Sequence, residues 1–333
     1  MSASTASTPT TAGDWNRETS IPHNYDKQLP ILQEARILVI GDPKDESMAR
    51  VYDENNWSSS NYTILGIGNT KEALDWDALQ KTHPTILLVT SKGTRDLLAE
   101  CLTTFSSAIQ WVHARSAGIE HCTSPTLAAT PPQLVMTNAK GHFSSTLAEY
   151  GMMACSYFAK DLPRLLQQHA DKNWQRYDIV ELRGATMGIV GYGDIGRATA
   201  KLAHAYGMKV VALKRKRTNA DEDPYCDEIY YSQENPQALN QLCAQSDYIF
   251  VAAPLTPQTK GLIGKEQFGV MKSTAVLINV GRGPVIDEDA LIEALQSNKL
   301  KGAGLDVFSE EPLPKESKLW DLTKKVLLSP YVI

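Results

Sequence analysis

Residues 191–196 constrain the fold of this chain more than any other part of its sequence. The segment consists of Gly191, Tyr192, Gly193, Asp194, Ile195 and Gly196, a GxGxxG pattern. An apolar run at 185–190 precedes it and a helical pattern at 195–206 follows it. A strand, a glycine turn and a helix in this order are typical of a dinucleotide-binding turn, in which the backbone approaches a pyrophosphate at the helix N-terminus. A purely structural glycine turn is the alternative, and the context favours the nucleotide.

The cations that end the next predicted strand indicate which dinucleotide is bound. The strand at 209–213 runs into Lys214, Arg215, Lys216 and Arg217. An NAD site usually places Asp or Glu there for the ribose 2′-hydroxyl, and this chain has neither. Guanidinium and ammonium groups suit a 2′-phosphate. The sequence therefore predicts NADP(H), with NAD(H) as the alternative cofactor. A solvated basic loop that binds no ligand is the other interpretation.

Apolar runs and amphipathic stretches alternate along the chain and predict two α/β series. Strands are expected at 35–40, 62–67, 85–89, 110–114 and 135–137, and then at 185–190, 209–213, 248–252, 275–279, 302–307 and 325–328. Helices are expected at 95–103, 195–206, 236–245, 265–270 and 288–297. Because repeated strand–helix units form parallel sheets, we expect an α/β fold of two Rossmann-like lobes with a cofactor cleft between them.

A long helix at 144–169 is expected to join the two lobes, with a kink near Pro163. The predicted organisation is a disordered leader at 1–30, a substrate domain at 31–143, a dinucleotide-binding domain at 144–328 and a truncated C-terminal segment at 329–333. The leader is rich in Ser and Thr and lacks the apolar core of a secretory signal.

Charge and cysteine usage exclude several classes of protein. A net charge of −5 argues against nucleic acid as the main partner. No apolar run approaches the roughly 20 residues that span a membrane. The five cysteines form no CxxC pair, so we expect no metal site and incidental thiols in a reducing compartment, the cytoplasm.

The stretch 247–313 resembles the nucleotide domain of the D-isomer-specific 2-hydroxyacid dehydrogenases. It contains NVGRG at 279–283, LDVF at 305–308 and EEP at 310–312. SAGIEH at 116–121 and TLAE at 146–149 match more loosely, and the resemblance covers most of residues 35–331. It implies reduction of a 2-oxo acid to a D-2-hydroxy acid, or the reverse, by hydride transfer. It also implies a homodimer.

The resemblance assigns roles to individual residues. Arg282 would hold the substrate carboxylate and polarise its carbonyl for hydride attack, and Glu311 would tune the catalytic acid. The backbone N–H groups of Ala117 and Gly118 would meet the substrate carboxylate. Further cofactor contacts would come from Ala253, Pro254, Thr259, Val280, Gly281 and Asp306. Without the resemblance, Arg282 could be a surface cation, and Asp306 and Glu311 could be loop-capping acids.

Tyr331 stands where the family places the histidine that protonates the new alkoxide, and no histidine follows His204. Three interpretations stay open. Tyr331 donates the proton itself, although an unperturbed tyrosine titrates near about pH 10 and would need a nearby cation such as Arg282. His113 or His142 of the first lobe donates it instead. Or proton transfer is lost, and the chain is a catalytically impaired NAD(P)-binding regulatory or interaction protein.

Overall fold

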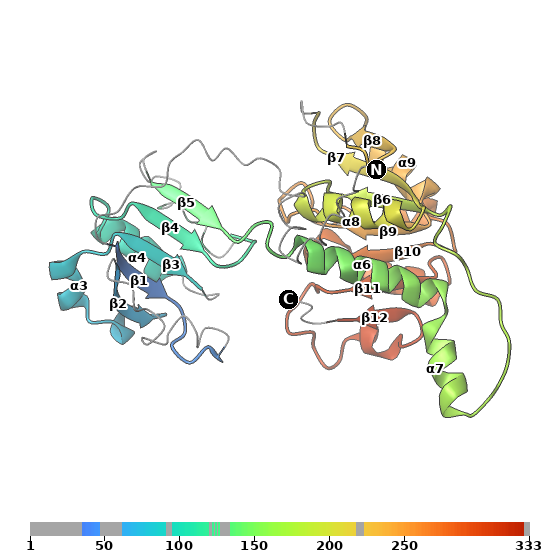
Figure 1. Ribbon diagram of the computed structural model, residues 1–333, viewed down its shortest axis with the longest axis horizontal. Helices are drawn as coiled ribbons and strands as arrows, with labels where there is room; N and C mark the ends of the chain where they lie inside the picture. The colour runs from blue at the N-terminus through green and yellow to red at the C-terminus, as the bar shows by residue number, and fades with distance from the viewer. Residues whose placement is uncertain are drawn as a thin grey trace, which may run out of the picture. The chain divides into compact units, whose positions relative to one another are not determined.

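The computed structural model describes residues 35–46, 62–90, 95–119, 122, 124, 126, 134–217 and 223–329. The described residues form two compact units, one ending at His142 and one beginning at Phe143, and each is considered by itself. Each unit contains a sheet in which every strand pairing is parallel (Figure 1). The predicted α/β class with two parallel sheets is thereby confirmed.

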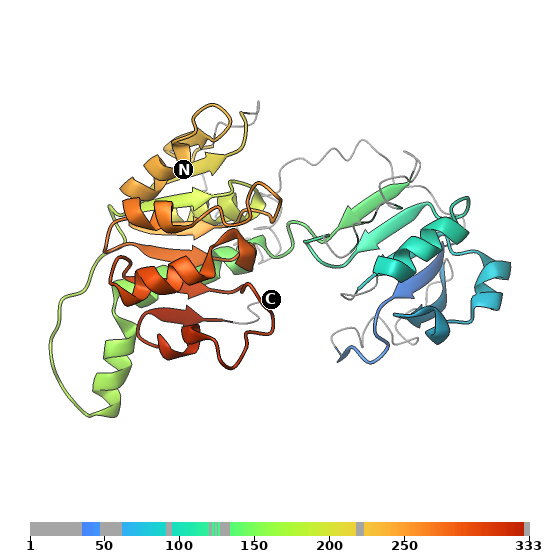
Figure 2. The same ribbon diagram turned by 180° about the vertical axis from the view of Figure 1, so that it is seen from behind.

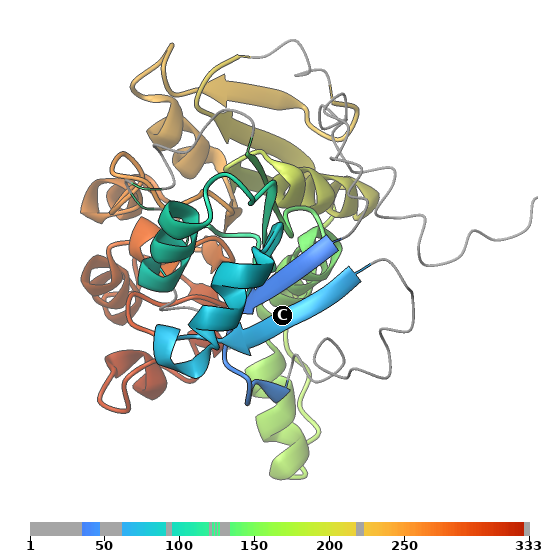
Figure 3. The same cartoon turned by 90° about the vertical axis from the view of Figure 1, so that its left-hand side faces the viewer.

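The first unit is built on a five-stranded sheet with the order β2-β1-β3-β4-β5. Its elements are β1 (Ala35–Ile40), β2 (Tyr62–Gly68), η3 (Lys71–Ala73), α3 (Trp76–Thr82), β3 (Ile86–Val89), α4 (Arg95–Thr104), β4 (Trp111–Ala114) and β5 (Val135–Asn138). Strands β1 and β2 lie side by side in Figure 3. The alternating residues Leu38 and Ile40 of β1 and Val112 of β4 join Leu98 and Cys101 of α4 in one core, as expected for side chains that point alternately to the two faces of a strand.

The second unit is built on a seven-stranded sheet with the order β12-β11-β10-β9-β6-β7-β8. Its helices are α6 (Ser144–Ala159), α7 (Leu162–Ala170), α8 (Asp194–Ala205), α9 (Ala238–Gln245), α10 (Lys265–Val270) and α11 (Glu288–Gln296), with short η4 (Gly283–Val285) and η5 (Lys318–Asp321). Its strands are β6 (Thr186–Val190), β7 (Lys209–Lys214), β8 (Glu228–Tyr231), β9 (Tyr248–Val251), β10 (Val276–Asn279), β11 (Gly302–Leu305) and β12 (Val326–Leu328).

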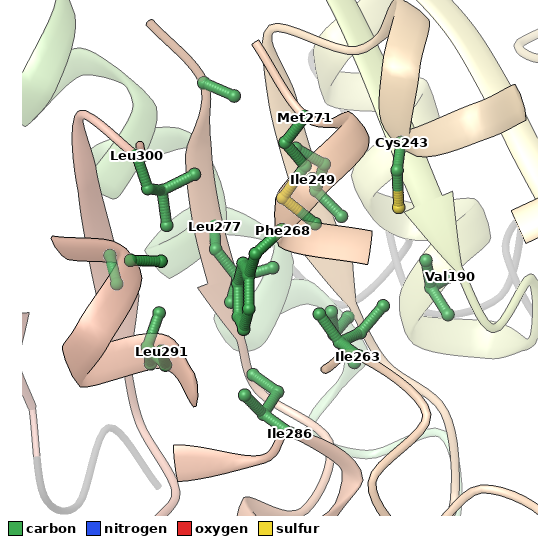
Figure 4. Packing of buried hydrophobic residues seen from close by; sticks show 14 of the residues in the cluster. Val190, Cys243, Ile249, Ile263, Phe268, Met271, Leu277, Ile286, Leu291 and Leu300 are labelled. Atoms are coloured by element: carbon green, nitrogen blue, oxygen red, sulfur yellow. The ribbon is translucent and has the colours of Figure 1, made fainter. Parts of the chain in front are cut away.

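Helices cover both faces of this second sheet. Helices α6 and α8 lie on one face (Figure 1), and α9, α10 and α11 lie on the opposite face (Figure 2). On the second face, Phe268 of α10, Leu291 of α11 and the loop residues Ile263 and Ile286 pack around Leu277 of β10 (Figure 4). Burying each such side chain stabilises the folded state by about 1.5–3 kcal/mol. This layer therefore stabilises the strands whose carboxyl ends carry the loops of the site.

The helix predicted at 144–169 is two helices instead of one kinked helix. Helix α6 ends at Ala159, and Asp161 adopts a left-handed conformation with φ 48° before α7 begins. Pro163 occupies the first turn of α7. Proline is well tolerated there, because the N–H groups of a first turn have no intrahelical partner. The proline therefore starts a new helix where a kink was predicted.

One α-helix and one strand were missing from the sequence prediction, besides the short η helices. Helix α3 buries only Leu79, and it starts because Asp75 accepts a hydrogen bond from the Ala78 N–H at 2.9 Å. Strand β8 has four residues and pairs only with β7 at the edge of the sheet. Both are too short for hydrophobic periodicity to reveal them. Among the described residues, no helix is long and apolar enough to cross a membrane.

Candidate active site

The glycine turn lies where the strand order of the second sheet reverses. Strands β7 and β8 extend to one side of β6, whereas β9 to β12 extend to the other. In open parallel sheets, ligands bind outside the carboxyl ends of the strands at such a switch point. Gly191 follows β6 there and donates its N–H to the Leu213 carbonyl of β7 at 3.2 Å. Ala252 follows β9 and donates to Val190 at 2.9 Å.

The three glycines of the turn are required for different reasons. Gly191 has φ +98°, and a Cβ on it would lie 2.6 Å from the Ala253 nitrogen. A Cβ on Gly196 would lie 2.5 Å from the Gly191 carbonyl oxygen. A Cβ on Gly193 would meet nothing within 4 Å. Packing within the protein therefore explains Gly191 and Gly196, whereas the open space at Gly193 fits a ligand that approaches the backbone.

The open space at Gly193 lies at the N-terminus of α8. Gly193 is the N-cap and makes no side-chain capping hydrogen bond, since it has no side chain. Uncapped N–H groups and the positive end of the helix dipole form a suitable site for phosphate. Asp194, the first helical residue, is buried, and Ile195 is half-buried beside the core of the α6 face. These features fit a pyrophosphate held by main-chain atoms.

The side chain of Tyr192 belongs to the core of the second unit. It is buried, and the Arg197 guanidinium lies 5.8 Å from its ring centroid. Burial, with the nearby Cys226 and Asp223, strongly raises the pKa of the Tyr192 hydroxyl. The phenol therefore stays neutral, and any contact of this residue with a cofactor phosphate would come from its main chain.

The four cations at the end of β7 and directly after it have different surroundings. Arg217 pairs with Glu234 at 3.3 Å, and its guanidinium lies 4.3 Å above the ring of Tyr231. Arg215 and Lys216 are exposed, and within the part of the chain that the structure describes they form no ion pair. Lys214 is the last residue of β7 and is half-buried. Arg215 and Lys216 are therefore the cations best able to bind an added phosphate.

Two further loops meet the glycine turn. Ala253 follows β9, and Gly281 follows β10, where Val280 donates its N–H to Val251 at 3.0 Å. A Cβ on Gly281 would lie 2.7 Å from the Ala253 carbonyl oxygen. Ala253 also contacts Gly191. The loop after β9 therefore touches both the loop after β6 and the loop after β10. A ligand at the glycine turn would therefore reach the loop that carries Arg282.

Thr259 stabilises the loop after β9 from within. Its hydroxyl donates to the Pro254 carbonyl at 2.6 Å and accepts from the Thr256 N–H at 2.7 Å. Pro254 is exposed and Ala253 is buried. The side-chain bonds of Thr259 thus set the path of the loop, and a cofactor would meet that loop through Ala253 and Pro254.

Asn279 sets the conformation of the Arg282 loop, and sequence reasoning missed it. It is 1% exposed at the end of β10. Its amide donates to the Arg282 carbonyl at 3.1 Å and accepts from the Gly281 N–H at 3.1 Å. The Arg282 guanidinium in turn donates to the Gly281 carbonyl at 2.8 Å. The signal that could have revealed Asn279 is a lone polar residue at the end of an otherwise apolar strand, because buried polar groups are nearly always hydrogen-bonded.

The Arg282 loop packs backbone to backbone against the loop that contains Glu311. A Cβ on Gly283 would overlap the carbonyl group of Phe308. Glu311 accepts from the Phe308 N–H at 3.0 Å, and Glu288 of α11 accepts from the Ser309 N–H at 3.1 Å. The structure therefore brings the Arg282 and Glu311 loops together. Glu288, a further residue that sequence reasoning missed, secures the second loop.

Asp306 connects these loops to β11. Its backbone N–H donates to the Asn279 carbonyl at 3.0 Å, which continues the ladder between β10 and β11 beyond Leu305. Asp306 is half-buried. Tyr331, the residue at the position of the family histidine, lies outside the described residues.

The predicted substrate loop of the first unit is held by two side chains. Asn138 donates to the Ala117 carbonyl at 2.6 Å, and the Ser116 hydroxyl donates to the Gly118 carbonyl at 2.7 Å. With both carbonyl groups bonded, the orientation of the peptide planes is set before a substrate arrives. Asn138 and Ser116 were not among the predicted site residues.

His113 lies in β4, which precedes this loop in the chain. Its hydrogen bonds and its pKa determine whether it can donate a proton. Its Nδ1 atom is 2.8 Å from the Thr137 hydroxyl, which also accepts from the Trp111 indole N–H at 2.8 Å. Burial, and secondarily the charge of His142, lower the pKa of His113 below the ordinary histidine value. His113 is therefore largely neutral near pH 7 and a poor source of protons there.

Comparisons with known proteins extend this description. The family model "D-isomer specific 2-hydroxyacid dehydrogenase, NAD binding domain" matches residues 152–332. A glyoxylate/hydroxypyruvate reductase B of Enterobacter sp. strain 638 is 44% identical over 149 residues, which cover 45% of this chain and 44% of the relative. The chain spans about half the length of the curated relatives it matches most strongly.

Solved structures are similar over more of the chain. A D-isomer specific 2-hydroxyacid dehydrogenase family protein from Aeromonas salmonicida subsp. salmonicida is 26% identical with a TM-score of 0.69, and the match covers 89% of this chain and 88% of that one. A D-isomer specific 2-hydroxyacid dehydrogenase from Xanthobacter autotrophicus, solved in complex with NADPH and MES, is 32% identical with a TM-score of 0.52. That match covers 57% of this chain and 75% of that one.

Proposed function

Because this chain belongs to the D-isomer specific 2-hydroxyacid dehydrogenases, we propose that it transfers a hydride between NADP(H) and a small 2-oxo acid, with the D-2-hydroxy acid as the reduced product. One observation carries the proposal. The glycine turn, the loop after β9 and the Arg282 loop touch one another at the switch point of the sheet, through Gly191, Ala253 and Gly281. A cofactor on the turn would thereby lie next to a cation suited to an α-keto acid.

The cofactor supplies the hydride when it is bound, and the protein supplies binding, orientation and charge. The turn from Gly191 to Gly196 and the N-terminus of α8 would hold the pyrophosphate. Arg282 binds the substrate carboxylate and draws electron density from the carbonyl that accepts the hydride.

Tyr331 is the proposed donor of the proton that completes the hydroxyl group. Glu311 would orient it, as the family acid orients histidine, and Arg282 would favour the charged form of the phenol. The low affinity of neutral His113 for protons supports this choice over His113, and His142 stays the alternative donor. Tyr331→Phe should lower kcat by about 10²–10⁴-fold, the usual contribution of general acid catalysis. Unchanged kcat in Tyr331→Phe would remove Tyr331 from the mechanism.

Reduction of 2-oxo acids is tested by following NADPH oxidation at 340 nm. Glyoxylate and hydroxypyruvate are the first substrates, since a 44% identical relative is named for them, followed by bulkier 2-oxo acids. The expected result is turnover that Arg282→Lys weakens strongly, because lysine cannot form the bidentate contact with a carboxylate. Cofactor binding without turnover of any 2-oxo acid would refute the proposed reaction.

NADP(H) is proposed over NAD(H) because two exposed cations follow β7 where an acid would mark an NAD site. Arg215 and Lys216 would bind the 2′-phosphate, while the ion pair with Glu234 occupies Arg217. Fluorescence titration should give a lower Kd for NADPH than for NADH, and equal values would refute the preference.

A second function is favoured by the tyrosine at position 331. If proton transfer is lost, the chain would be a nicotinamide-nucleotide-binding regulatory protein with little reductase activity. Tyr331→His distinguishes the two functions. A large rise in activity in that variant would identify the native protein as an impaired enzyme, whereas a fall would support tyrosine as the acid.

A homodimer in the cytoplasm is proposed as the assembly and its location. Helix α7 and the segment after it expose the apolar side chains Leu165, Leu166, Trp174, Ile179 and Val180, and exposed apolar patches commonly mark protein interfaces. Among the described residues the five cysteines form no disulfide with one another, as is usual in a reducing compartment. Light scattering of the purified protein and fractionation of its source cells test the two statements.

A further inference from the structure

The chain after β8 runs beside the cations that follow β7. Strand β8 forms one edge of the second sheet (Figure 1) and pairs with β7 in parallel, with Tyr231 opposite Lys214. Beyond the strands, the Ser232 N–H donates to the Lys214 carbonyl at 2.9 Å. The Gln233 N–H donates to the Arg215 carbonyl at 3.0 Å. The residue that follows Gln233 therefore lies close to the proposed phosphate-binding cations.

That residue is an acid, Glu234, and a turn holds its backbone. The Glu234 N–H donates to the Tyr231 carbonyl at 3.1 Å, and the Asn235 N–H donates to the same carbonyl at 3.0 Å. The Asn235 side chain in turn accepts from the Gln237 N–H at 2.9 Å. The backbone between β8 and α9 is thus fixed by its own hydrogen bonds, and the fold itself places the Glu234 carboxylate.

Arg217 is the cation that this acid binds. Its guanidinium donates to the Glu234 carboxylate at 3.3 Å and lies 4.3 Å from the centroid of the Tyr231 ring. The two charged side chains are 65% and 51% exposed, and ion pairs at such surface positions contribute little to stability. The fold therefore does not depend on this pair, and the guanidinium is free to exchange the carboxylate for another anion.

We infer that Glu234 is a specificity-determining residue of the cofactor site, because it withholds Arg217 from the 2′-phosphate that distinguishes NADP(H) from NAD(H). The inference rests on the proposed function for the identity of the ligand, and on the contact between Arg217 and Glu234 for its mechanism. Arg217 can bind the phosphate only after the pair with Glu234 has broken. The phosphate is therefore left to Arg215 and Lys216, and the preference for NADP(H) is smaller than the four cations alone would give.

The withheld cation has a predictable effect on affinity. A phosphate monoester carries about −1.5 to −2 charges near pH 7, and a guanidinium binds it with charge-assisted hydrogen bonds. One such bond changes affinity by roughly ten- to a hundredfold. Because the pair is exposed to water, we expect the lower end of this range, about tenfold. NADH has no 2′-phosphate and should not respond.

The test is a double-mutant cycle with Glu234→Gln and Arg217→Gln, measured as the Kd of NADPH and of NADH by fluorescence titration. An ionic strength of about 0.15 M screens the more distant charges. Glu234→Gln should lower the Kd of NADPH about tenfold and change the Kd of NADH less than about twofold. In the Arg217→Gln background, the same substitution should change the Kd of NADPH less than about twofold, because no guanidinium remains to be released.

Three results of this cycle overturn the inference. An unchanged Kd of NADPH in Glu234→Gln would make the pair an ordinary surface ion pair without influence on the cofactor. A raised Kd would mean that Glu234 orients Arg217 toward the phosphate, which is the opposite role. Equal effects in both backgrounds would mean that the carboxylate acts on the phosphate directly and not through Arg217.

Glu228→Gln is the matched control for the change in net charge. Glu228 is exposed and is the first residue of β8, at the other end of the strand from Glu234. This variant loses the same charge and should bind both cofactors as the wild type does. Equal shifts in Glu228→Gln and Glu234→Gln would assign the effect to net charge and overturn the inference. A lowered Tm in Glu234→Gln with weaker binding of both cofactors would assign a structural role and overturn it as well.

The outcomes separate this inference from the proposed function. Binding is the measured quantity, so the cycle does not depend on whether a 2-oxo acid is reduced. If the wild-type protein prefers NADH and Glu234→Gln gains affinity for NADPH, the proposed cofactor preference fails and the inference stands. If the wild type binds NADPH and Glu234→Gln leaves that affinity unchanged, the inference alone fails. If the wild type binds neither cofactor, both fail.

Discussion

Alanine substitutions at two glycines of the same turn should have opposite consequences. Gly191→Ala places a Cβ 2.6 Å from the Ala253 nitrogen at a residue with φ +98°. The backbone conformation costs alanine about 1–2 kcal/mol, and the overlap with a packed neighbour adds about 1–3 kcal/mol. A loss of about 2–5 kcal/mol should lower Tm by roughly 4–20 °C in a unit of this size.

Gly193→Ala should leave the fold intact and damage the site. Its φ is −100°, and the added Cβ meets nothing within 4 Å. Alanine in a compatible conformation stabilises a protein by about 0.4–1 kcal/mol, because the unfolded chain loses freedom. The new methyl group occupies the space that a pyrophosphate needs, so the Kd of NADPH should rise at least about tenfold, or about 1.4 kcal/mol.

Thermal unfolding by circular dichroism and fluorescence titration with NADPH measure the two effects. Gly269→Ala in α10 is a suitable control, because its Cβ also meets nothing within 4 Å. This control should gain about 1 kcal/mol from helix propensity and bind NADPH normally. Wild-type affinity in Gly193→Ala would refute the assignment of that space to a phosphate.

Three further predictions concern the loops, the cations and one histidine. Asn279→Leu should lower kcat/KM by about 10²-fold, because a misplacement of Arg282 by about 1 Å costs that much. Stopped-flow assays at saturating NADPH measure this loss. Full activity of the variant would contradict the role of the Asn279 amide. Replacing Arg215 and Lys216 by serine should raise the Kd of NADPH and leave that of NADH unchanged, which paired titrations check; equal losses for both cofactors would argue against a 2′-phosphate site. The lowered pKa of His113 means that the unfolded chain takes up its proton at a higher pH than the folded chain does. The free energy of unfolding should therefore fall as pH drops below about 6.5. Urea titrations should show a smaller fall in His113→Gln, and identical pH slopes would exclude this contribution.

Long, strongly patterned elements were predictable, and short ones were not. The strand predicted from the apolar run at Ala35–Ile40 has the same bounds as β1. Helix α3 and strand β8 depend on one cap and one neighbouring strand, so their sequences carry little signal of their own. The break before α7 shows the same limit. Pro163 predicts a disturbance, but whether it kinks a helix or starts another depends on the left-handed Asp161 beside it.

The same distinction applies to the candidate site. Its motifs could be predicted from the sequence, whereas the contacts that depend on packing could not. GxGxxG and NVGRG mark backbone that must come close to other backbone, and the contacts of Gly191 and Gly281 with Ala253 give the physical reason. A motif does not by itself say which side chains hold those loops still.

Asn279 does so within its own NVGRG motif, by hydrogen bonds to Gly281 and Arg282. Asn138 and Glu288 do so from outside the quoted motifs, by hydrogen bonds to the main chain of Ala117 and Ser309. Such bonds need only a polar group of the right reach, so many residue types satisfy them and no spacing rule identifies them.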